Sequence, residues 1–356
     1  MAFPMVQHGL EMNEIAGHCA APIDAGVSVR CEKVSPAPRQ IADPLFILSA
    51  PRSFSSVVCA MLGQHPQMYG LPEMHLFGDE RLEGWFRLGS GDTLRHGLLR
   101  AVTQLCFGAQ TERNVKLADA WLKRRSSFTS GMIFEELALR AAPAILVDKS
   151  PSMVYSLEAM QRAYRFFPQA RFIHLARHPR GHGQSVLKYL QELGKPEYRI
   201  KDAIPAWIDD LASFSYSPAA WEGEPKELKD PQCGWYVLNR NIATFLKSVP
   251  PQQWMVLRGE DLLREADRGL RQVARWLGLR TDTEAIEEMK HPERSPYSRF
   301  GPRGAGIGND MFFLKDPVLR PARGDAHSLE GPLDWRKDGM GFLPEVKELA
   351  QRLGYR

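Results

Sequence analysis

Short apolar runs alternate with longer amphipathic segments along most of the chain. The runs suited to buried strands lie at 45–49, 144–148, 171–176 and 254–258. Segments with helical spacing of apolar residues lie between them, at 57–63, 152–166, 181–193 and 234–248. Strands that alternate with helices predict right-handed βαβ units within one parallel sheet. The expected fold class is therefore α/β, with a doubly wound parallel sheet flanked by helices.

Three parts of the chain depart from this alternation. Residues 78–142 hold no convincing strand, and they predict a helical insertion over the active-site edge through amphipathic segments at 93–107, 113–125 and 130–141. Residues 291–335 are rich in Gly, Pro and Arg, which is typical of a long functional loop. Residues 1–42 lack clear periodicity and are interpreted as an N-terminal extension to a single domain at 43–356.

Composition narrows the class of protein. With 356 residues, 44% hydrophobic and 25% charged, the chain has the make-up of a soluble globular protein. A net charge of +4 suits an anionic ligand or an acidic protein partner, but it is too small to favour nucleic acid. Five scattered cysteines without a CxxC pair favour a reducing compartment. No apolar run is long enough for a membrane span and the first residues lack a secretory pattern, so we expect a cytoplasmic protein without membrane insertion.

The turn after the first predicted strand carries an anion-binding pattern. Residues 49–56 read Ser-Ala-Pro-Arg-Ser-Phe-Ser-Ser, and helical spacing begins directly after them. A strand that turns straight into a helix presents free backbone N–H groups at the positive end of that helix. Arg52 and the hydroxyls of Ser53, Ser55 and Ser56 add a fixed cation and further donors. The pattern is not a Walker A motif, because GxxxxGK[ST] is absent, and an ordinary serine-capped helix start is the alternative interpretation.

Two further segments suit anions. Arg177 ends the third predicted strand, and Ser185 lies eight residues later within the next helix. The carboxyl ends of parallel strands meet at one edge of the sheet, so these side chains can converge on a phosphate there. The segment 301–310 contains four glycines and Arg303, which would let the backbone approach an anion closely. A flexible surface loop is the alternative for this last segment.

These segments resemble the cofactor sites of sulfotransferases that use 3′-phosphoadenosine 5′-phosphosulfate (PAPS). The turn at 49–56 resembles their 5′-phosphosulfate loop, Arg177 and Ser185 resemble their 3′-phosphate site, and Arg303 with Gly304 matches their closing loop by order and composition. The resemblance implies a P-loop-like fold and no metal requirement. It also implies that PAPS contacts Arg52, Ser53, Phe54, Ser55, Ser56, Arg177, Ser185, Arg303 and Gly304.

A metal site is not predicted from the histidines near the third strand. His174, His178 and His182 are spaced by four residues, as ligands on one face of a helix would be. However, His174 lies within a predicted strand and Pro179 interrupts any helix there.

A narrower resemblance comes from the C-terminal third. Residues 291–297, the glycine-rich segment that ends at 308–310, and the Leu-Asp-Trp-Arg-Lys-Asp-Gly run at 333–339 resemble sulfotransferase domains of polyketide synthases. Those domains sulfonate the β-hydroxyl of an acyl chain held on an acyl carrier protein. The resemblance extends from about residue 44 to the C-terminus. It implies a carrier-bound polyketide or fatty acyl acceptor in secondary metabolism, and a free small-molecule alcohol or a glycolipid is the alternative acceptor.

The general base is also taken from the resemblance. Steroid and phenol sulfotransferases carry Lys-x-His after the second strand, whereas here Lys149 is followed by serine and then by Pro151 in place of the histidine. The segment 71–75 follows the first helix and should return to the active edge of the sheet, and its Glu73 lies where polyketide and tyrosylprotein sulfotransferases have their base. A carboxylate in a cleft can take a hydroxyl proton if burial raises its pKa. His75 is the second candidate for the base. His291 is the third and is better suited to orienting the acceptor.

Arg52 and Lys149 are the expected cations for charge on the transferring sulfuryl group and on the bridging oxygen. Two other classes remain open from the residues. A kinase-like or nucleotide-hydrolysing P-loop protein would need a Walker lysine and an acidic magnesium site, and neither is evident. A non-catalytic nucleotide-binding module would share the anion sites and lack the transfer reaction.

Overall fold

The computed structural model describes residues 41–87, 93–192, 194, 230–321 and 328–356. At its centre is a five-stranded sheet in the order β2-β3-β1-β4-β5, in which each neighbouring pair is parallel. The strands are β1 (Leu45–Leu48), β2 (Met68–Gly70), β3 (Ile145–Asp148), β4 (Arg171–Ala176) and β5 (Trp254–Arg258). The predicted α/β class is confirmed, and the four predicted strands lie within a residue of their expected bounds.

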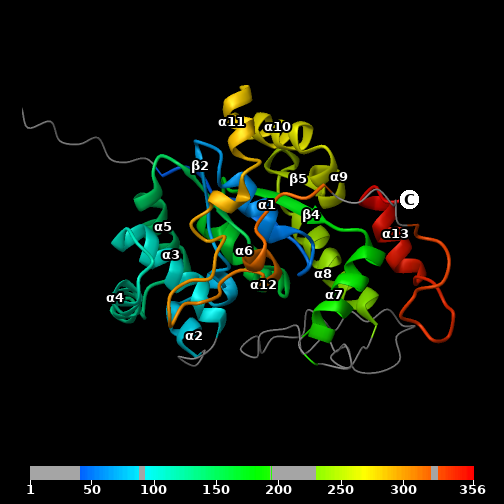
Figure 1. Cartoon of the computed structure of the whole chain (residues 1–356), viewed down its shortest axis with the longest axis horizontal. Helices are drawn as coiled ribbons and strands as arrows, with labels where there is room; N and C mark the ends of the chain where they lie inside the picture. Colours follow the sequence, from blue (N-terminus) through cyan, green and yellow to red (C-terminus); the bar gives the residue numbers. More distant parts are fainter. Residues whose placement is uncertain (1–40, 88–92, 193, 195–229, 322–327) are drawn as a thin grey trace, which may run out of the picture. The chain divides into compact units, whose positions relative to one another are not determined.

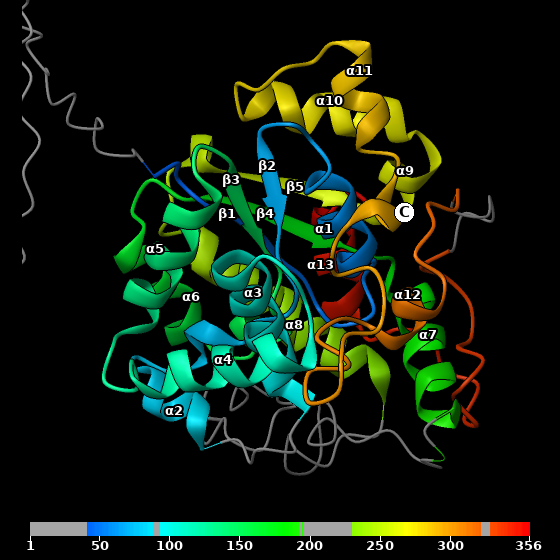
Figure 2. The same cartoon turned by 60° about the vertical axis from the view of Figure 1, so that its left-hand side comes forward.

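Helices cover both faces of this sheet (Figure 1 and Figure 2). In β1, Leu45 and Ile47 point to one apolar cluster, and Phe46 and Leu48 point to the other. The first cluster includes side chains of α1 (Ser55–Leu62), α9 (Gly259–Arg264), α10 (Ala266–Trp276) and α11 (Thr283–Glu288). The second includes side chains of α6 (Leu157–Phe166), α7 (Pro179–Glu192) and α8 (Pro231–Leu246). A strand buried on both faces explains why its sequence reads as a continuous apolar run.

The segment between β2 and β3 is helical, as its amphipathic pattern predicts. It contains α2 (Leu82–Phe86), α3 (His96–Phe107), α4 (Glu112–Lys123) and α5 (Ser130–Ala141). Thr111 and Thr129 cap the N-termini of α4 and α5, since their hydroxyls accept backbone N–H groups of the first turn. These helices bury their apolar sides in the second cluster.

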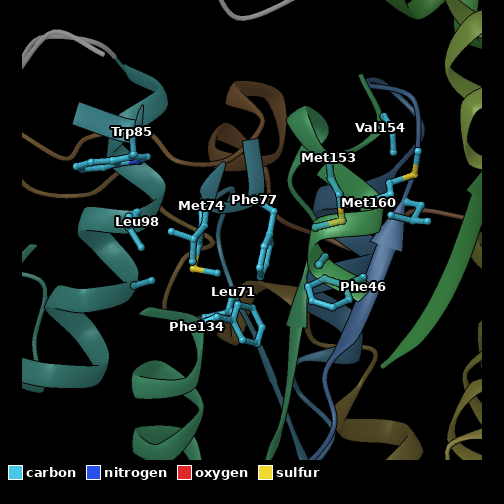
Figure 3. Close-up of a cluster of buried hydrophobic side chains, with 14 of the residues drawn as sticks. Phe46, Leu71, Met74, Phe77, Trp85, Leu98, Phe134, Met153, Val154 and Met160 are labelled. Carbon is cyan, nitrogen blue, oxygen red and sulfur yellow. The ribbon is translucent and has the colours of Figure 1, made fainter. Parts of the chain in front are cut away.

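Figure 3 shows how this cluster fixes the loop that follows β2. Leu71 and Met74 are buried beside Phe77 and Phe134, with Phe46 of β1 in the same group. Apolar residues on both sides of Glu73 thus anchor the loop to the core. Between these two anchors, Pro72 is also buried and Glu73 presents a partly exposed carboxylate at the edge of the sheet.

The C-terminal residues brace α7. The Arg180 guanidinium donates to the backbone carbonyls of Ser328, Glu330 and Pro332. Gly183 lies so close to Trp335 that a Cβ there would be 2.5 Å from the indole ring. Residues 328–335, at the end of the segment expected to form a long functional loop, therefore pack against the helix that carries Ser185.

The remaining elements are α12 (Met311–Lys315) and α13 (Pro344–Arg352). The expectation of an N-terminal extension falls outside the described residues, apart from 41 and 42. None of the helices in the described part of the chain is both long and apolar enough to cross a membrane.

Candidate active site

The strand order places charged side chains in a row along the carboxyl edge of the sheet. Glu73 follows β2, Lys149 follows β3, Arg52 follows β1 and Arg177 follows β4. Because these strands are neighbours in that same order, the row runs Glu73, Lys149, Arg52, Arg177. Ligands of open parallel sheets bind at this edge.

The turn before α1 has a backbone conformation that needs support from its surroundings. Arg52 and Phe54 have φ angles of 66° and 65°, in the left-handed region that side chains disfavour. The Arg177 guanidinium donates to the Arg52 carbonyl at 2.7 Å and lies 4.3 Å from the centre of the Phe54 ring. Gly259 makes room for that ring, since a Cβ at this glycine would be 2.4 Å from it. Arg177 thus holds the turn from the neighbouring strand.

Two neighbouring cavities open beside this turn. The first, of about 700 Å³, is lined by residues 52–57 and by side chains from α7 and from the α12 region. The second, of about 400 Å³, is lined by Gly181, Gln184 and Ser185 of α7. Arg52, Arg177, Lys188 and Phe312 line both cavities. The structure therefore brings together Arg52, Ser53, Phe54, Ser55, Ser56, Arg177 and Ser185 from the predicted set.

The two guanidinium groups of this site are partly buried, and their Nε atoms are buried without full pairing. The Nε atoms of Arg52 and Arg177 have no hydrogen-bond acceptor among the described residues. Burial, opposed by Glu260 and assisted by nearby Arg52, lowers the pKa of Arg177 to about 10. Burial likewise lowers the pKa of Arg52. Desolvated donors of this kind gain strongly from an anionic acceptor, so the residues fit a ligand with two anionic groups.

Lys149 and Glu73 form a buried ion pair beside the turn. The Lys149 ammonium is almost fully buried, donates to Ser56 Oγ at 2.7 Å and pairs with Glu73 Oε1. The other carboxylate oxygen of Glu73 lies 3.8 Å from His75 Nε2, and His75 Nδ1 lies 3.0 Å from Ser152 Oγ. The structure thus brings Glu73, His75 and Lys149 together.

The pKa of Glu73 is lowered, so the condition that burial raises it is not met. Burial does favour the neutral carboxyl, but Lys149 and then His75 and Arg52 stabilise the carboxylate by more. Glu73 is therefore ionised at neutral pH and able to accept a proton. Its 20% exposed side chain leaves the carboxylate within reach of a ligand.

The structure does not bring His291, Arg303 or Gly304 to this group. His291 Nδ1 lies 2.9 Å from Glu293 Oε1, in the segment after α11. Arg303 is exposed and lines neither cavity, and Gly304 is next to Val115 of α4.

Packing against α3 explains the position of the glycine-rich segment. The buried Arg100 guanidinium donates to the backbone carbonyls of Arg299 and Ile307. Gly308 has a φ of 95°, and a Cβ there would be 2.8 Å from Gly97 of α3. Gly301 and Gly308 of this segment permit close contact between backbones, and neither glycine lines the cavities. The motif alone does not distinguish these two uses.

Several residues that line the cavities were not predicted. The Arg52 guanidinium lies 4.9 Å from the centre of the Phe312 ring and 5.1 Å from that of Tyr189. Lys188 lies three residues after Ser185, so helical spacing could have placed it on the same face. Asp310 and Phe312 carry no comparable signal, because their approach depends on the fold of residues 299–312.

Metal binding has no support from clusters of ligating side chains. In the ranges that the structure describes, no group of three or more His, Cys, Asp and Glu residues could hold a metal ion. His174 instead lies 2.9 Å from Asn239 through its Nε2, and burial lowers its pKa to about 4.

Asp148 gives the fold a pH-dependent stability. Burial raises its pKa from 3.8 to about 7, and its Oδ2 has no partner among the described residues. At pH values between 3.8 and about 7, the Asp148 carboxyl of the unfolded chain has lost its proton while that of the folded chain retains it. The free energy of unfolding therefore falls as pH rises through this range, by as much as about 4 kcal/mol. Asp148→Asn removes this penalty. In thermal denaturation we expect the difference between the melting temperatures of Asp148→Asn and the wild type to increase from about pH 4 to about pH 7 and then to level off. A difference that does not change with pH would contradict this.

Comparison with known proteins agrees with this architecture. Residues 44–283 match the model of the sulfotransferase family. Among solved structures, the chain is similar to the sulfotransferase domain from the curacin biosynthetic pathway, with a TM-score of 0.65, 21% identity, and coverage of 89% of this chain and 99% of the other. It is also similar to the sulfotransferase domain of the Synechococcus PCC 7002 olefin synthase, with a TM-score of 0.62, 24% identity, and coverage of 90% and 98%. No curated protein sequence matches the chain.

Proposed function

Since the chain belongs to the sulfotransferase family, we propose that it transfers a sulfuryl group from PAPS to an alcohol, the β-hydroxyl of an acyl chain on an acyl carrier protein. The observation that carries the donor assignment is a pair of neighbouring cavities, both lined by Arg52 and Arg177. Each of these guanidinium groups has an Nε without an acceptor among the described residues. PAPS has two anionic ends, the 5′-phosphosulfate and the 3′-phosphate. ATP has no 3′-phosphate and would leave the second group of donors unused.

In this proposal the two cavities take different ends of the donor. The N-terminus of α1, Arg52 and the serines of the turn bind the 5′-phosphosulfate. Arg177 and Ser185 bind the 3′-phosphate, with Lys188 beside them. Glu73 lies at the other end of the row, on the side from which the acceptor would enter.

The transfer itself follows from the order of the row. Glu73 takes the proton of the acceptor hydroxyl as its oxygen forms a bond to sulfur. The bond between sulfur and the 5′-phosphate oxygen breaks, and adenosine 3′,5′-bisphosphate leaves. Lys149, between Glu73 and Arg52, contacts Ser56 and is placed to neutralise the charge that grows on the bridging oxygen. His75 holds the Glu73 carboxylate from the opposite side.

The carrier-bound acceptor is supported by the C-terminal motifs and by the pathways named for the two similar domains. Those domains belong to the curacin pathway and to an olefin synthase. A free small-molecule alcohol or a glycolipid is the competing acceptor, and the experiment must separate the two.

The test is incubation with PAPS labelled in the sulfuryl group and a panel of acceptors. The panel holds β-hydroxyacyl carrier proteins of several chain lengths, the matching free hydroxy acids and a hydroxylated glycolipid. We expect the label to appear on the carrier protein. Hydrolysis of the thioester should then release the label together with the acyl chain. Label only on free alcohols or the glycolipid would overturn the carrier assignment. If no label is transferred and calorimetry detects no binding of adenosine 3′,5′-bisphosphate, the sulfotransferase proposal fails.

A further inference from the structure

A carboxylate lies inside the cavity that is otherwise suited to anions. Asp310 lines the first cavity together with Arg52 and residues 53–57, and its carboxylate pairs with the Arg52 guanidinium. Its backbone N–H also lies 3.4 Å from Ser56 Oγ, the atom that accepts from Lys149. A negative charge at this place weakens the attraction for any anion and therefore needs a reason.

The position of Asp310 does not depend on its pairing with Arg52. Its Oδ1 accepts the backbone N–H groups of Phe312 at 2.8 Å and Phe313 at 3.3 Å, which fixes the carboxyl at the start of α12. Phe313 and Leu314 are buried against Ala60 of α1. The carboxylate is therefore built into the wall of the cavity, and its Oδ2 faces the cation of the turn.

A fixed carboxylate in the cavity wall would discriminate between bound groups by their negative charge. A sulfuryl group and a terminal phosphoryl group have the same tetrahedral shape, but the sulfuryl group carries one negative charge and the phosphoryl group about −1.5 to −2 at pH 7. Shape and hydrogen-bonding donors cannot separate them. At an effective dielectric constant of about 20, a carboxylate placed about 5 Å from such a group would disfavour the additional negative charge by more than about tenfold in binding.

We propose that Asp310, paired with Arg52 at the start of α1, makes the donor site selective for a sulfuryl end over a phosphoryl end. The proposal rests on the proposed function, since it assumes that the phosphosulfate binds in the first cavity. Arg52 supplies the attraction, and Asp310 cancels enough of it that a monoanionic group is accepted and a dianionic group is disfavoured.

Asp310→Asn is a conservative test, because asparagine caps helices as well as aspartate does and keeps the size of the side chain. Calorimetric titration at pH 8 compares PAPS with adenosine 3′-phosphate 5′-diphosphate, in which phosphate replaces the sulfate. We expect the wild type to prefer PAPS. In Asp310→Asn we expect this preference to fall by about tenfold or more, mainly through tighter binding of the diphosphate.

Asp267→Asn is the control for loss of a carboxylate, because Asp267 is exposed, pairs with Lys290 and lines neither cavity. It should leave the ratio of the two affinities unchanged. The proposal is overturned if Asp310→Asn leaves the ratio unchanged, or if Asp267→Asn shifts it equally. An unchanged ratio in a protein that binds PAPS overturns the selectivity alone, whereas a wild type that binds neither nucleotide overturns the proposed function as well.

Discussion

Glu73→Gln is expected to lower kcat by about 10²- to 10⁴-fold, the range typical of a lost general base. Glutamine can still accept a hydrogen bond from Lys149, but it cannot take the proton of the acceptor hydroxyl. The affinity for adenosine 3′,5′-bisphosphate should stay within about threefold, because Glu73 lies at the acceptor end of the row. Single-turnover sulfuryl transfer and calorimetric titration measure the two quantities separately.

The pH profile of the same variant tests the role of Glu73 as base. The pKa of Glu73 is lowered, so wild-type activity should persist below neutral pH and fall only as the pH drops through that lowered value. The residual activity of Glu73→Gln should lack this acidic limb. Glu136→Gln removes a carboxylate paired with Arg125 in the helical insertion and serves as control. Equal losses in the two variants, or full activity in Glu73→Gln, would remove Glu73 as the base.

Arg177→Gln should weaken the binding of adenosine 3′,5′-bisphosphate by about 100-fold, the effect of losing about two charge-assisted hydrogen bonds. The reason is that its guanidinium lines both cavities and its Nε has no acceptor among the described residues. Adenosine 5′-phosphosulfate, which lacks the 3′-phosphate, should lose far less affinity. Titrations of the two nucleotides against wild type and variant measure the difference.

The comparison of nucleotides is needed because Arg177 also supports the turn through the Arg52 carbonyl and the Phe54 ring. If that support were its whole role, both nucleotides would lose affinity equally, and the 3′-phosphate assignment would be wrong. Thermal denaturation shows whether the variant remains folded. Arg268→Gln, which removes an exposed arginine paired with Glu265, is the control for loss of a positive charge.

Much of the fold follows from local patterns in the sequence. The strands β1, β3 and β4 are largely buried and mostly apolar, and β5 at the edge of the sheet is an apolar run in which only Leu257 is buried. Such runs are visible without knowledge of their neighbours. The strand β2 spans only Met68–Gly70 and was not predicted, because three residues show no periodicity. The helix expected at 152–166 is divided, since a short 3₁₀ turn at Pro151–Val154 precedes α6 and Ser156 caps it.

The site was predictable to the extent that it lies at strand ends. Arg52, Lys149 and Arg177 each follow a recognisable strand, and parallel strands bring their carboxyl ends together whatever the rest of the chain does. Glu73 follows the unrecognised β2, so its place was inferred from its position after the first helix and from the family resemblance rather than from a predicted strand. Its lowered pKa depends on distances to Lys149 and His75 that no sequence pattern contains.

The glycine-rich segment shows why loops are harder to predict. Arg100 and Gly97 of α3 determine where residues 299–308 lie, and these partners are about two hundred residues away in the chain. A glycine beside an arginine suits both an anion site and close backbone packing. The choice between them is made by tertiary contacts.

The bracing of α7 also bears on the order in which the protein acquires its properties during synthesis. Arg180 needs the carbonyls of Ser328, Glu330 and Pro332, and the backbone N–H of His178 donates to Glu260, whose other carboxylate oxygen accepts the Tyr355 hydroxyl. All five strands end by Arg258, so the sheet can assemble while these last partners are still inside the ribosome. The contacts of α7 with residues 328–355 form only when those residues have emerged. A nascent chain would thus have its sheet before α7 is fully braced.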